Sequence, residues 1–285
     1  MQRKLHPLEG IVAICALVLV LFVSVGFAQA QDVRKIALRS SSALVQDADT
    51  GEVVFGKNTD AVVSIASITK LMTAMVILDY GLDLDEEIVL TQEDAVRMKG
   101  SRSRLRTGLK LTRGDLLLLA LMASDNRAAA ALGQSYPGGL EAFVDAMNVK
   151  AALLDMDETR FVEPTGLSPA NVSTAADLAK LVRAAHEYPL IREYSTKTRA
   201  TVHASGRPLS YGNTNHLVRS KYWDIELSKT GYISEAGRCL VMQVRLAEKD
   251  LIVVLLDSWG RHSRIGDANR IRKWLETGAA RGRSS

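Results

Sequence analysis

Three short strings, far apart in the sequence, constrain what this chain can fold into more than any other feature. They are Ser67-Ile68-Thr69-Lys70, Ser124-Asp125-Asn126 and Lys229-Thr230-Gly231, and they occur in that order. Ser67 is the only serine in the chain with a lysine three residues later. Strings of this kind are typical of serine acyl-transfer enzymes that use a lysine as the base in place of a histidine. The fold must therefore bring three distant segments to one place.

Ser67 and Lys70 are spaced so that a helix would place both side chains on one face. Residues 67–80 show helical apolar spacing, and Gly81 provides a stop signal. The helix start would favour negative charge at Ser67. Burial of Lys70 and repulsion from Lys229 would lower the pKa of Lys70, so that its neutral amine can act as a base. Taken alone, the pair would be a helix cap followed by a surface lysine.

Ser124-Asp125-Asn126 interrupts an apolar stretch, between residues 116–122 and a helix expected over residues 127–132. Polar side chains at such an interruption would face a cleft. We expect Ser124 to relay a proton to the leaving nitrogen and Asn126 to hydrogen-bond a substrate amide. An ordinary turn between two helices is the alternative, since Ser, Asp and Asn all favour turns.

Lys229-Thr230-Gly231 is expected to end an alternating strand over residues 226–230. The cation of Lys229 and the hydroxyl of Thr230 would bind a carboxylate, and Gly231 would let a substrate backbone approach the strand. The N–H of Tyr232 would then pair with the N–H of Ser67 as an oxyanion hole. A plain turn at the end of a strand is the alternative.

The remaining pattern predicts an α+β fold. We expect β-hairpins over residues 43–55 and 240–256, a helical middle and a closing helix over residues 265–275. Capping boxes should start two helices, over residues 112–122 and 174–187, and Pro189 should end the second. We interpret Asn171-Val172-Ser173 as a turn before that second helix. No linker rich in Pro, Gly or Ser divides the chain, so we expect one catalytic domain over residues 31–285.

The first 30 residues resemble an export signal. Arg3 and Lys4 precede an apolar stretch over residues 11–27, and Ala28-Gln29-Ala30 provides a small-x-small cleavage site. We expect a signal peptide over residues 1–30 that is cleaved after Ala30. An uncleaved membrane anchor is the alternative, because 17 apolar residues are near the lower limit for a membrane span. Ile14 before Cys15 argues against a lipid anchor.

Several other classes of protein are disfavoured. The formal net charge is only +4 and Lys and Arg form no long run, so we expect no nucleic-acid partner. Cys239 would be the only cysteine after cleavage, and its apolar surroundings indicate a buried strand thiol. The sequence contains no G-x-S-x-G, G-x-G-x-x-G, Walker or H-E-x-x-H string. We therefore expect no metal ion and no organic cofactor.

From about residue 40 to residue 275 the chain resembles the low-molecular-mass penicillin-binding proteins. Within them, the resemblance is to D-alanyl-D-alanine endopeptidases of the penicillin-binding protein 7 type. The strings that carry it contain or accompany the three motifs, and they are IASITKLMTA (65–74), SDNRAA (124–129), EPTGLS (163–168), NVSTA (171–175) and KTGYISEAG (229–237).

The resemblance implies the β-lactamase/transpeptidase-like fold, an antiparallel sheet flanked by helices with an inserted helical lobe. It also implies a periplasmic enzyme that remodels peptidoglycan, either free or loosely associated with the membrane. In this family the serine that matches Ser67 attacks a D-Ala carbonyl and forms an acyl-enzyme that water hydrolyses, with Lys70 as the base. Lys229 and Thr230 would hold the carboxylate beside the scissile bond. β-Lactam antibiotics would acylate the same serine as covalent inhibitors.

The favoured activity is that of an endopeptidase on D-Ala-diaminopimelate cross-links. A D-Ala-D-Ala carboxypeptidase acting on pentapeptide stems is the first alternative, disfavoured because membrane-attached family members usually add a second β-rich domain and a C-terminal helix. A class A β-lactamase would share all three motifs, and Glu163-Pro164 superficially resembles its deacylating glutamate loop. A wall-binding scaffold with a vestigial site is the last alternative, although every catalytic side chain is present.

Overall fold

The structure is a computed structural model that describes residues 36–96 and 103–282. Leu38–Ser285 forms one compact unit. The predicted signal peptide over residues 1–30 lies outside the described residues, and so does its cleavage site. Among the helices of residues 36–96 and 103–282, none has the length and apolar character needed to cross a membrane.

A five-stranded antiparallel sheet forms the central layer of this unit, with the strand order β2-β1-β11-β10-β9. Its strands are β1 (Ser40–Asp47), β2 (Val53–Lys57), β9 (Asp224–Ile233), β10 (Gly237–Leu246) and β11 (Lys249–Ser258). The two hairpins predicted near the ends of the chain therefore exist, and they pair with each other through β1 and β11, with Val45 opposite Val253. Because β10 and β11 are apolar along most of their length, the sheet needs cover on both faces.

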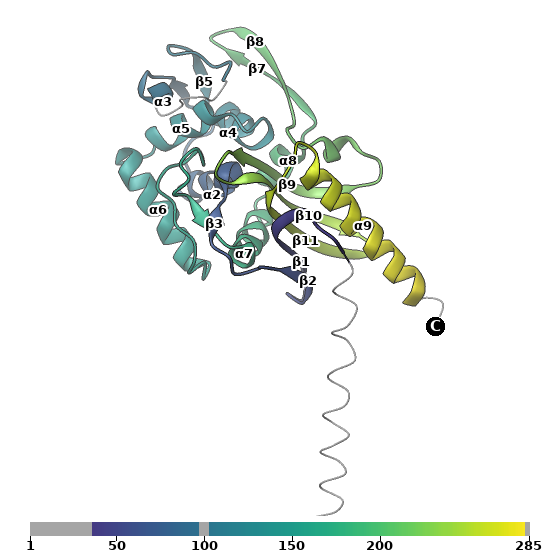
Figure 1. Cartoon of the computed structure of the whole chain (residues 1–285). Helices are drawn as coiled ribbons and strands as arrows, with labels where there is room; N and C mark the ends of the chain where they lie inside the picture. The colour runs from purple at the N-terminus through teal and green to yellow at the C-terminus, as the bar shows by residue number, and fades with distance from the viewer. Residues whose placement is uncertain (1–35, 97–102, 283–285) are drawn as a thin grey trace, which may run out of the picture. The chain divides into compact units, whose positions relative to one another are not determined.

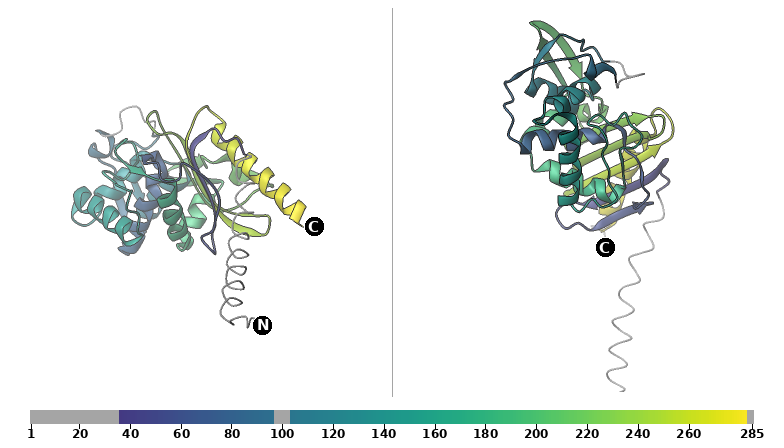
Figure 2. Two further views of the ribbon diagram at one scale, coloured as in Figure 1. Left: turned by 60° about the horizontal axis from the view of Figure 1, so that its bottom comes forward. Right: turned by 90° about the vertical axis from the view of Figure 1, so that its left-hand side faces the viewer.

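Helices supply that cover (Figures 1 and 2). The C-terminal helix α9 (Ser263–Gly282) packs against β1, β10 and β11 on one side. The helix α7 (Ala175–His186) packs against β1, β10 and β11 on the other side. The predicted α+β arrangement, an antiparallel sheet flanked by helices, is confirmed.

The inserted helical lobe is built around α2 (Lys70–Asp79), whose first eight residues are all buried. It contacts α4 (Arg113–Met122), α5 (Asn126–Gln134), α6 (Gly139–Leu153) and α8 (Pro189–Thr196). Smaller elements complete the lobe, and these are α3 (Glu93–Val96) and the strand pair β4 (Glu87–Val89) and β5 (Lys110–Thr112). A helix buried on all sides is expected from the apolar residues that cover most of its surface.

Both predicted capping boxes are present. Thr112 Oγ1 accepts a hydrogen bond from the N–H of Asp115 at 3.1 Å and starts α4. Thr174 Oγ1 does the same with Asp177 at 3.0 Å and starts α7. The prediction that Pro189 ends the second helix is wrong in detail, because α7 already ends at His186. Pro189 instead begins α8, where its missing N–H costs nothing.

Two other local predictions are also wrong. The string Asn171-Val172-Ser173 is not a turn, because Val172–Ser173 forms strand β6 and pairs with β3 (Val63–Ser64). Lys229-Thr230-Gly231 does not end its strand, because β9 continues to Ile233 through pairing with β10. The partner of β6 comes from a distant part of the chain, whereas the partner of β9 is the next strand of the same hairpin, which follows within a few residues. Cys239 is buried in β10 as predicted, and burial raises the pKa of its thiol to about 11.

The sequence analysis did not predict the hairpin of β7 (Arg199–Ala204) and β8 (Arg207–Gly212), which stands at the top of Figure 1. A short 3₁₀ helix, η3 (His216–Arg219), follows it and leads into β9. The hairpin thus lies next, in the chain, to the strand that carries the third motif.

Candidate active site

Ser67 lies in a tight turn before α2, the 3₁₀ helix η2 (Ala66–Thr69). The residue before it, Ala66, has a φ of +48°, a left-handed conformation that an alanine rarely adopts. Two glycines enclose this turn. A Cβ atom at Gly166 would lie 1.9 Å from the carbonyl oxygen of Ala66, and one at Gly231 would lie 3.1 Å from the backbone nitrogen of Ser67. Gly231 therefore makes room for the chain's own serine turn, beyond the predicted approach of a substrate.

Lys70 begins α2 and is completely buried. Its Nζ atom donates to Ser67 Oγ at 2.8 Å, to Asn126 Oδ1 at 2.7 Å and to the carbonyl oxygen of Thr165 at 2.5 Å. The predicted meeting of Ser67 and Lys70 on one face is confirmed. The amine is held by three acceptors from three separate segments, so its position relative to Ser67 is fixed.

The two buried lysines differ in what lowers their pKa values. Burial lowers the pKa of Lys70 to about 8, against the opposing effect of the negative charges of Glu163 and Asp125. Burial also lowers the pKa of Lys229 well below its usual value, and repulsion from Lys70 and Arg264 adds to this. The predicted decrease in the pKa of Lys70 is present, and it comes from burial. The repulsion between the two lysines instead lowers the pKa of Lys229. Near neutral pH a useful fraction of Lys70 is therefore neutral.

The second motif faces the third. Lys229 Nζ donates to Ser124 Oγ at 2.8 Å and to the carbonyl oxygen of Thr230 at 3.0 Å. Ser124 has a φ of +57°, and such strain in a residue other than glycine is concentrated at functional sites. Between Ser124 and Asn126, Asp125 caps α5 by accepting from the N–H of Ala128 at 3.1 Å. The string is thus a helix start as well as a part of the site.

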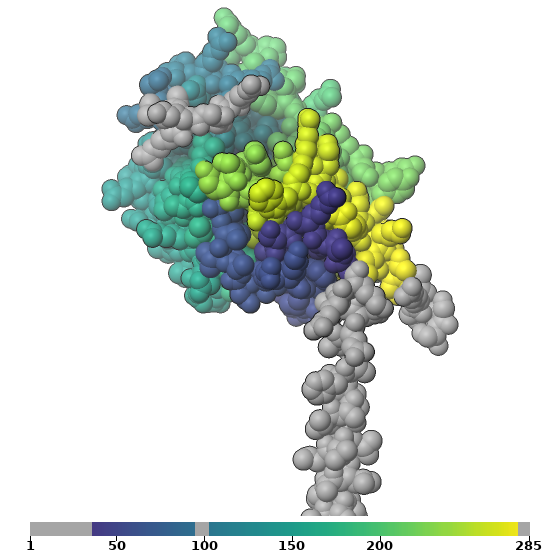
Figure 3. Space-filling model, viewed as in Figure 1, coloured from purple at the N-terminus to yellow at the C-terminus, as the bar shows by residue number. Residues whose placement is uncertain are grey.

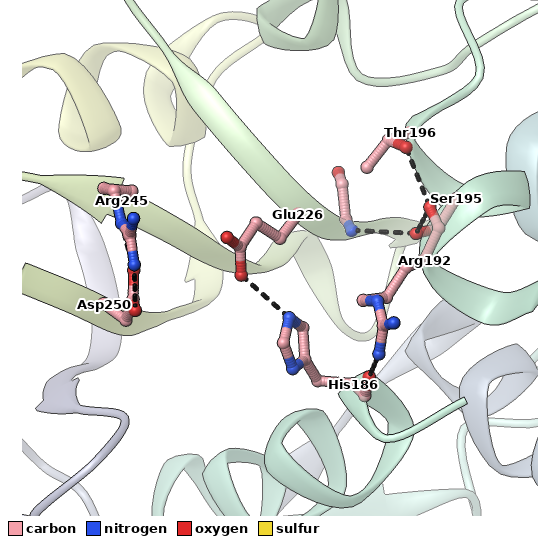
Figure 4. A network of polar contacts seen from close by, with 8 residues as sticks. His186, Arg192, Ser195, Thr196, Glu226, Arg245 and Asp250 are labelled. Carbon is pink, nitrogen blue, oxygen red and sulfur yellow. Dashed lines mark hydrogen bonds and ion pairs between the residues drawn. The ribbon is translucent and has the colours of Figure 1, made fainter. Parts of the chain in front are cut away.

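Strand β9 is held in place by α7 and α8 just before the third motif (Figure 4). His186 Nε2 and Glu226 Oε2 lie 2.8 Å apart, and the hydroxyl of Ser195 accepts from the N–H of Ser228 at 3.2 Å. These contacts fix the strand that carries Lys229. In this role His186 and Ser195 act as structural contacts of the strand.

Thr214 is a site residue that the sequence analysis missed. Its hydroxyl lies 2.7 Å from the hydroxyl of Thr230, and its N–H donates to the carbonyl oxygen of Met122 at 3.1 Å. It therefore connects the end of α4, two residues before the second motif, to the third motif. Its only sequence signal is its place in a polar stretch a few residues before the strand, which is too weak to single it out.

Glu163 is the other residue whose role the sequence did not reveal. Its carboxylate accepts four hydrogen bonds at 2.6–3.3 Å, from the N–H groups of Thr165, Gly166 and Ser168 and the side-chain amide of Asn171. The carboxylate thus folds residues 163–168 into the turn that presents the Thr165 carbonyl to Lys70. A carboxylate with its oxygens occupied in this way is poorly suited to activate water, which weakens its likeness to the deacylating glutamate of β-lactamases.

The predicted site residues fall into two hydrogen-bonded groups that lie side by side. Ser67, Lys70 and Asn126 form one, and Ser124 and Lys229 form the other. Thr230 is buried next to Lys229. Tyr232 follows the third motif and is 57% exposed. Across the described ranges 36–96 and 103–282, no cluster of three His, Cys, Asp or Glu side chains is arranged to hold a metal ion.

Comparison with known proteins agrees with this geometry. The family model described as D-alanyl-D-alanine carboxypeptidase, peptidase family S11, matches residues 28–260. The chain is 52% identical to a D-alanyl-D-alanine endopeptidase of Pseudomonas aeruginosa and 49% identical to one of Escherichia coli. Each match covers 85% of this chain and 78% of the relative.

The crystal structure of the Streptomyces K15 DD-transpeptidase superposes with a TM-score of 0.79, at 28% identity, and covers 86% of this chain and all of that one. The β-lactamase/transpeptidase-like fold is therefore confirmed. The serine turn, the two buried lysines and the family match agree in indicating a serine hydrolase. On these grounds the chain belongs to the D-alanyl-D-alanine carboxypeptidase family of serine peptidases, family S11.

Proposed function

We propose that the protein is a D-alanyl-D-alanine endopeptidase that hydrolyses D-Ala-diaminopimelate cross-links in peptidoglycan. The observation that carries the mechanism is the contact of 2.8 Å between Ser67 Oγ and the buried amine of Lys70, whose pKa is lowered to about 8. The two relatives from Pseudomonas aeruginosa and Escherichia coli support the choice of an endopeptidase, since both are named for that activity.

In the proposed reaction the neutral amine of Lys70 takes the proton of Ser67, and Ser67 Oγ attacks the D-Ala carbonyl carbon. The N–H groups of Ser67 and Tyr232 stabilise the oxyanion. The C–N bond then breaks while Asn126 holds the substrate amide. The proton taken up by Lys70 reaches the leaving amine through Ser124, whose hydroxyl gives up one proton and takes up another, so that Lys70 is neutral again. Water attacks the resulting ester, Lys70 takes a proton from the water and returns it to Ser67 Oγ as the ester bond breaks, and this releases the acid and frees Ser67.

The carboxylate beside the scissile bond is assigned to Lys229 and Thr230. Burial lowers the pKa of Lys229, and an incoming carboxylate would favour its charged form again, while the hydroxyl of Thr230 is oriented by Thr214. β-Lactams carry a carboxylate at a similar place beside their reactive amide. They are therefore expected to acylate Ser67 and to inhibit the enzyme covalently.

The working enzyme is proposed to be a periplasmic protein of residues 31–285, released from its signal peptide by cleavage after Ala30. Its macromolecular substrate is then peptidoglycan, with either free diffusion or loose association with the membrane. A carboxypeptidase acting on pentapeptide stems is the competing activity, because the family model is described by it.

The purified protein should be given a cross-linked muropeptide dimer and an uncross-linked pentapeptide monomer, with Ser67→Ala as the control. Conversion of the dimer to monomers, dependent on Ser67, is the expected result, with little change in the pentapeptide. Mass spectrometry distinguishes the products. Loss of one D-Ala from the pentapeptide with an intact dimer would establish the carboxypeptidase instead, and rapid turnover of a penicillin would establish a β-lactamase.

Acylation of Ser67 should depend on pH in a defined direction. Since the neutral form of Lys70 is the base and its pKa is about 8, the acylation rate should rise with pH below that value and level off above it. Stopped-flow measurement with a fluorescent penicillin between pH 6 and pH 10 would show the midpoint. A profile that is flat across this range would contradict the role of Lys70 as a base.

Glu163→Gln should shift that profile. Removal of the negative charge of Glu163 takes away an interaction that raises the pKa of Lys70, so the midpoint should move to lower pH. The rate at the plateau should also fall, by about 10-fold, because the amide cannot accept all four hydrogen bonds that the carboxylate accepts. Glu158→Gln, at an exposed position nearby, should leave the midpoint and the plateau rate unchanged. A fall in rate with an unmoved midpoint would mean that Glu163 acts only on the fold of the turn.

A further inference from the structure

A pocket of about 480 Å³ opens between the β7–β8 hairpin and the segment of residues 103–109. Figure 3 shows the hairpin in green and this segment in blue, side by side at the top of the unit. Three of the seven lining residues are arginines and none is acidic. The lining consists of Ser103, Arg104, Arg106, Leu109, Ala204, Arg207 and Leu209.

The arginines are arranged to receive an anion. Arg104 is held in place, because its Nη1 donates to the carbonyl oxygen of Ser210 at 2.5 Å and its guanidinium lies 4.8 Å from the centre of the Tyr211 ring. Arg106 and Arg207 are exposed and have no ion-pair partner among the residues that the structure describes. Guanidinium groups recognise carboxylates through paired hydrogen bonds. The pocket therefore presents positive charge without a carboxylate of its own to neutralise it.

The pocket is next to the catalytic site. Ser103 in its wall donates to both carboxylate oxygens of Asp125, at 2.8 and 3.1 Å, and Asp125 is the middle residue of the second motif. Strand β8 runs from Arg207 to Gly212 and reaches Thr214 two residues later, where Thr214 contacts Thr230. Leu209 and Thr214 are five positions apart in the chain, which spans at most about 18 Å when extended. A peptide stem of four or five residues spans about 14–18 Å when extended, so a stem held at Thr230 can reach the pocket.

We propose that Arg104, Arg106 and Arg207 form a subsite for a peptide carboxylate of the second stem of a cross-linked substrate, away from the scissile bond. This proposal rests on the endopeptidase function proposed above and deepens it. A dimer carries the second stem, whereas a pentapeptide monomer and a penicillin do not. The subsite would thus favour cross-linked substrates, a preference that the carboxylate site at Lys229 and Thr230 cannot create.

The test uses the full chain with the double substitution Arg106→Glu and Arg207→Glu. Loss of two charge-assisted contacts should lower kcat/KM for the muropeptide dimer by about 10–100-fold, mainly through KM. Acylation by benzylpenicillin should stay within twofold of the unchanged protein. The matched control is Arg199→Glu, an exposed arginine at the base of the same hairpin that does not line the pocket, and it should alter neither reaction.

Direct binding separates this proposal from the proposed function. In a Ser67→Ala background, calorimetry should show that the dimer binds 10–100-fold more weakly when the two arginines are replaced by glutamates. A dimer whose second-stem carboxylates are amidated, except the one beside the scissile bond, should bind as weakly to the protein with its arginines intact. If the unsubstituted enzyme fails to cleave the dimer but the Ser67→Ala form binds it in this way, only the endopeptidase assignment is wrong.

Two results would overturn the subsite. One is an unchanged KM and unchanged binding of the dimer in the double variant, which would make the arginines ordinary solvated side chains. The other is an equal loss of penicillin acylation, which would show that the substitutions disturb the catalytic site itself. Arg207→Lys keeps the charge but not the paired geometry, and an intermediate loss is expected for it.

Discussion

Lys70→Met is expected to lower the rate of acylation of Ser67 by about 10²–10⁴-fold, the usual contribution of a general base. Methionine is similar in length to lysine but cannot accept a proton. Since Lys70 is fully buried, an apolar replacement removes a desolvated cation but leaves the acceptors on Asn126 and Thr165 unpaired, so the protein should be less stable and still folded. The measurement is the time course of labelling by a fluorescent penicillin, with the melting temperature as the check on folding.

Lys70→Arg distinguishes the base from the charge. Arginine stays protonated in proteins, so it would retain a cation near Ser67 and lose the ability to accept a proton. Labelling should therefore be as slow in this variant as in Lys70→Met, and neither should show the rise towards pH 8. If Lys70→Arg kept more than about a tenth of the original rate, a cation rather than a base would be what Ser67 requires, because a base supplies at least about 10²-fold.

Gly166→Ala is expected to be the most damaging single substitution outside the catalytic side chains. Its Cβ would lie 1.9 Å from the carbonyl oxygen of Ala66 and 2.8 Å from the backbone nitrogen of Ser67, so the turn around the serine must move. Gly166 also has a φ of +78°, which disfavours alanine. Overpacking and backbone strain together should cost about 2–5 kcal/mol of unfolding free energy. Penicillin labelling should fall below detection even where the protein remains folded.

Gly81→Ala is the matched control for this substitution. Gly81 has a similar φ of +72°, and a Cβ atom there would have no neighbour within 4 Å. Gly81→Ala should therefore lower the free energy of unfolding only by the cost of a left-handed backbone conformation, about 1–2 kcal/mol, and penicillin labelling should be unaffected. Thermal unfolding and labelling of both variants would separate strain from contact. Similar losses in the two variants would mean that the approach of Gly166 to the serine turn is unimportant.

The sequence was sufficient to predict those features that depend on contacts between residues close together in the chain. The two capping boxes started α4 and α7 as predicted, because a side chain bonding to a backbone three residues away is a short-range interaction. The same holds for the meeting of Ser67 and Lys70, which helical geometry alone dictates. The β-hairpins were also visible from their apolar runs and turn residues.

The features that the sequence did not reveal depend on distant partners. The carbonyl of Thr165 reaches Lys70 across 95 residues, and Thr214 reaches Thr230 only after β8 and η3 have placed it. The third motif lies inside β9 instead of at its end because β10 pairs with the residues that follow it, and here the partner is near in the sequence. Similarly, Val172–Ser173 became a strand through β3. Neither the identity of these residues nor their spacing encodes where their partners come from.

The pairing of β1 with β11 has a consequence for how the protein acquires its structure. The hydroxyls of Ser40 and Ser258 lie 2.6 Å apart although 218 residues separate them in the chain. β1 lies between β2 and β11, so it can take its place in the sheet only after the last strand has become available. Closing so long a loop is slow, and proteins dominated by such distant contacts fold slowly. The central sheet of this chain can therefore be completed only near the end of its synthesis.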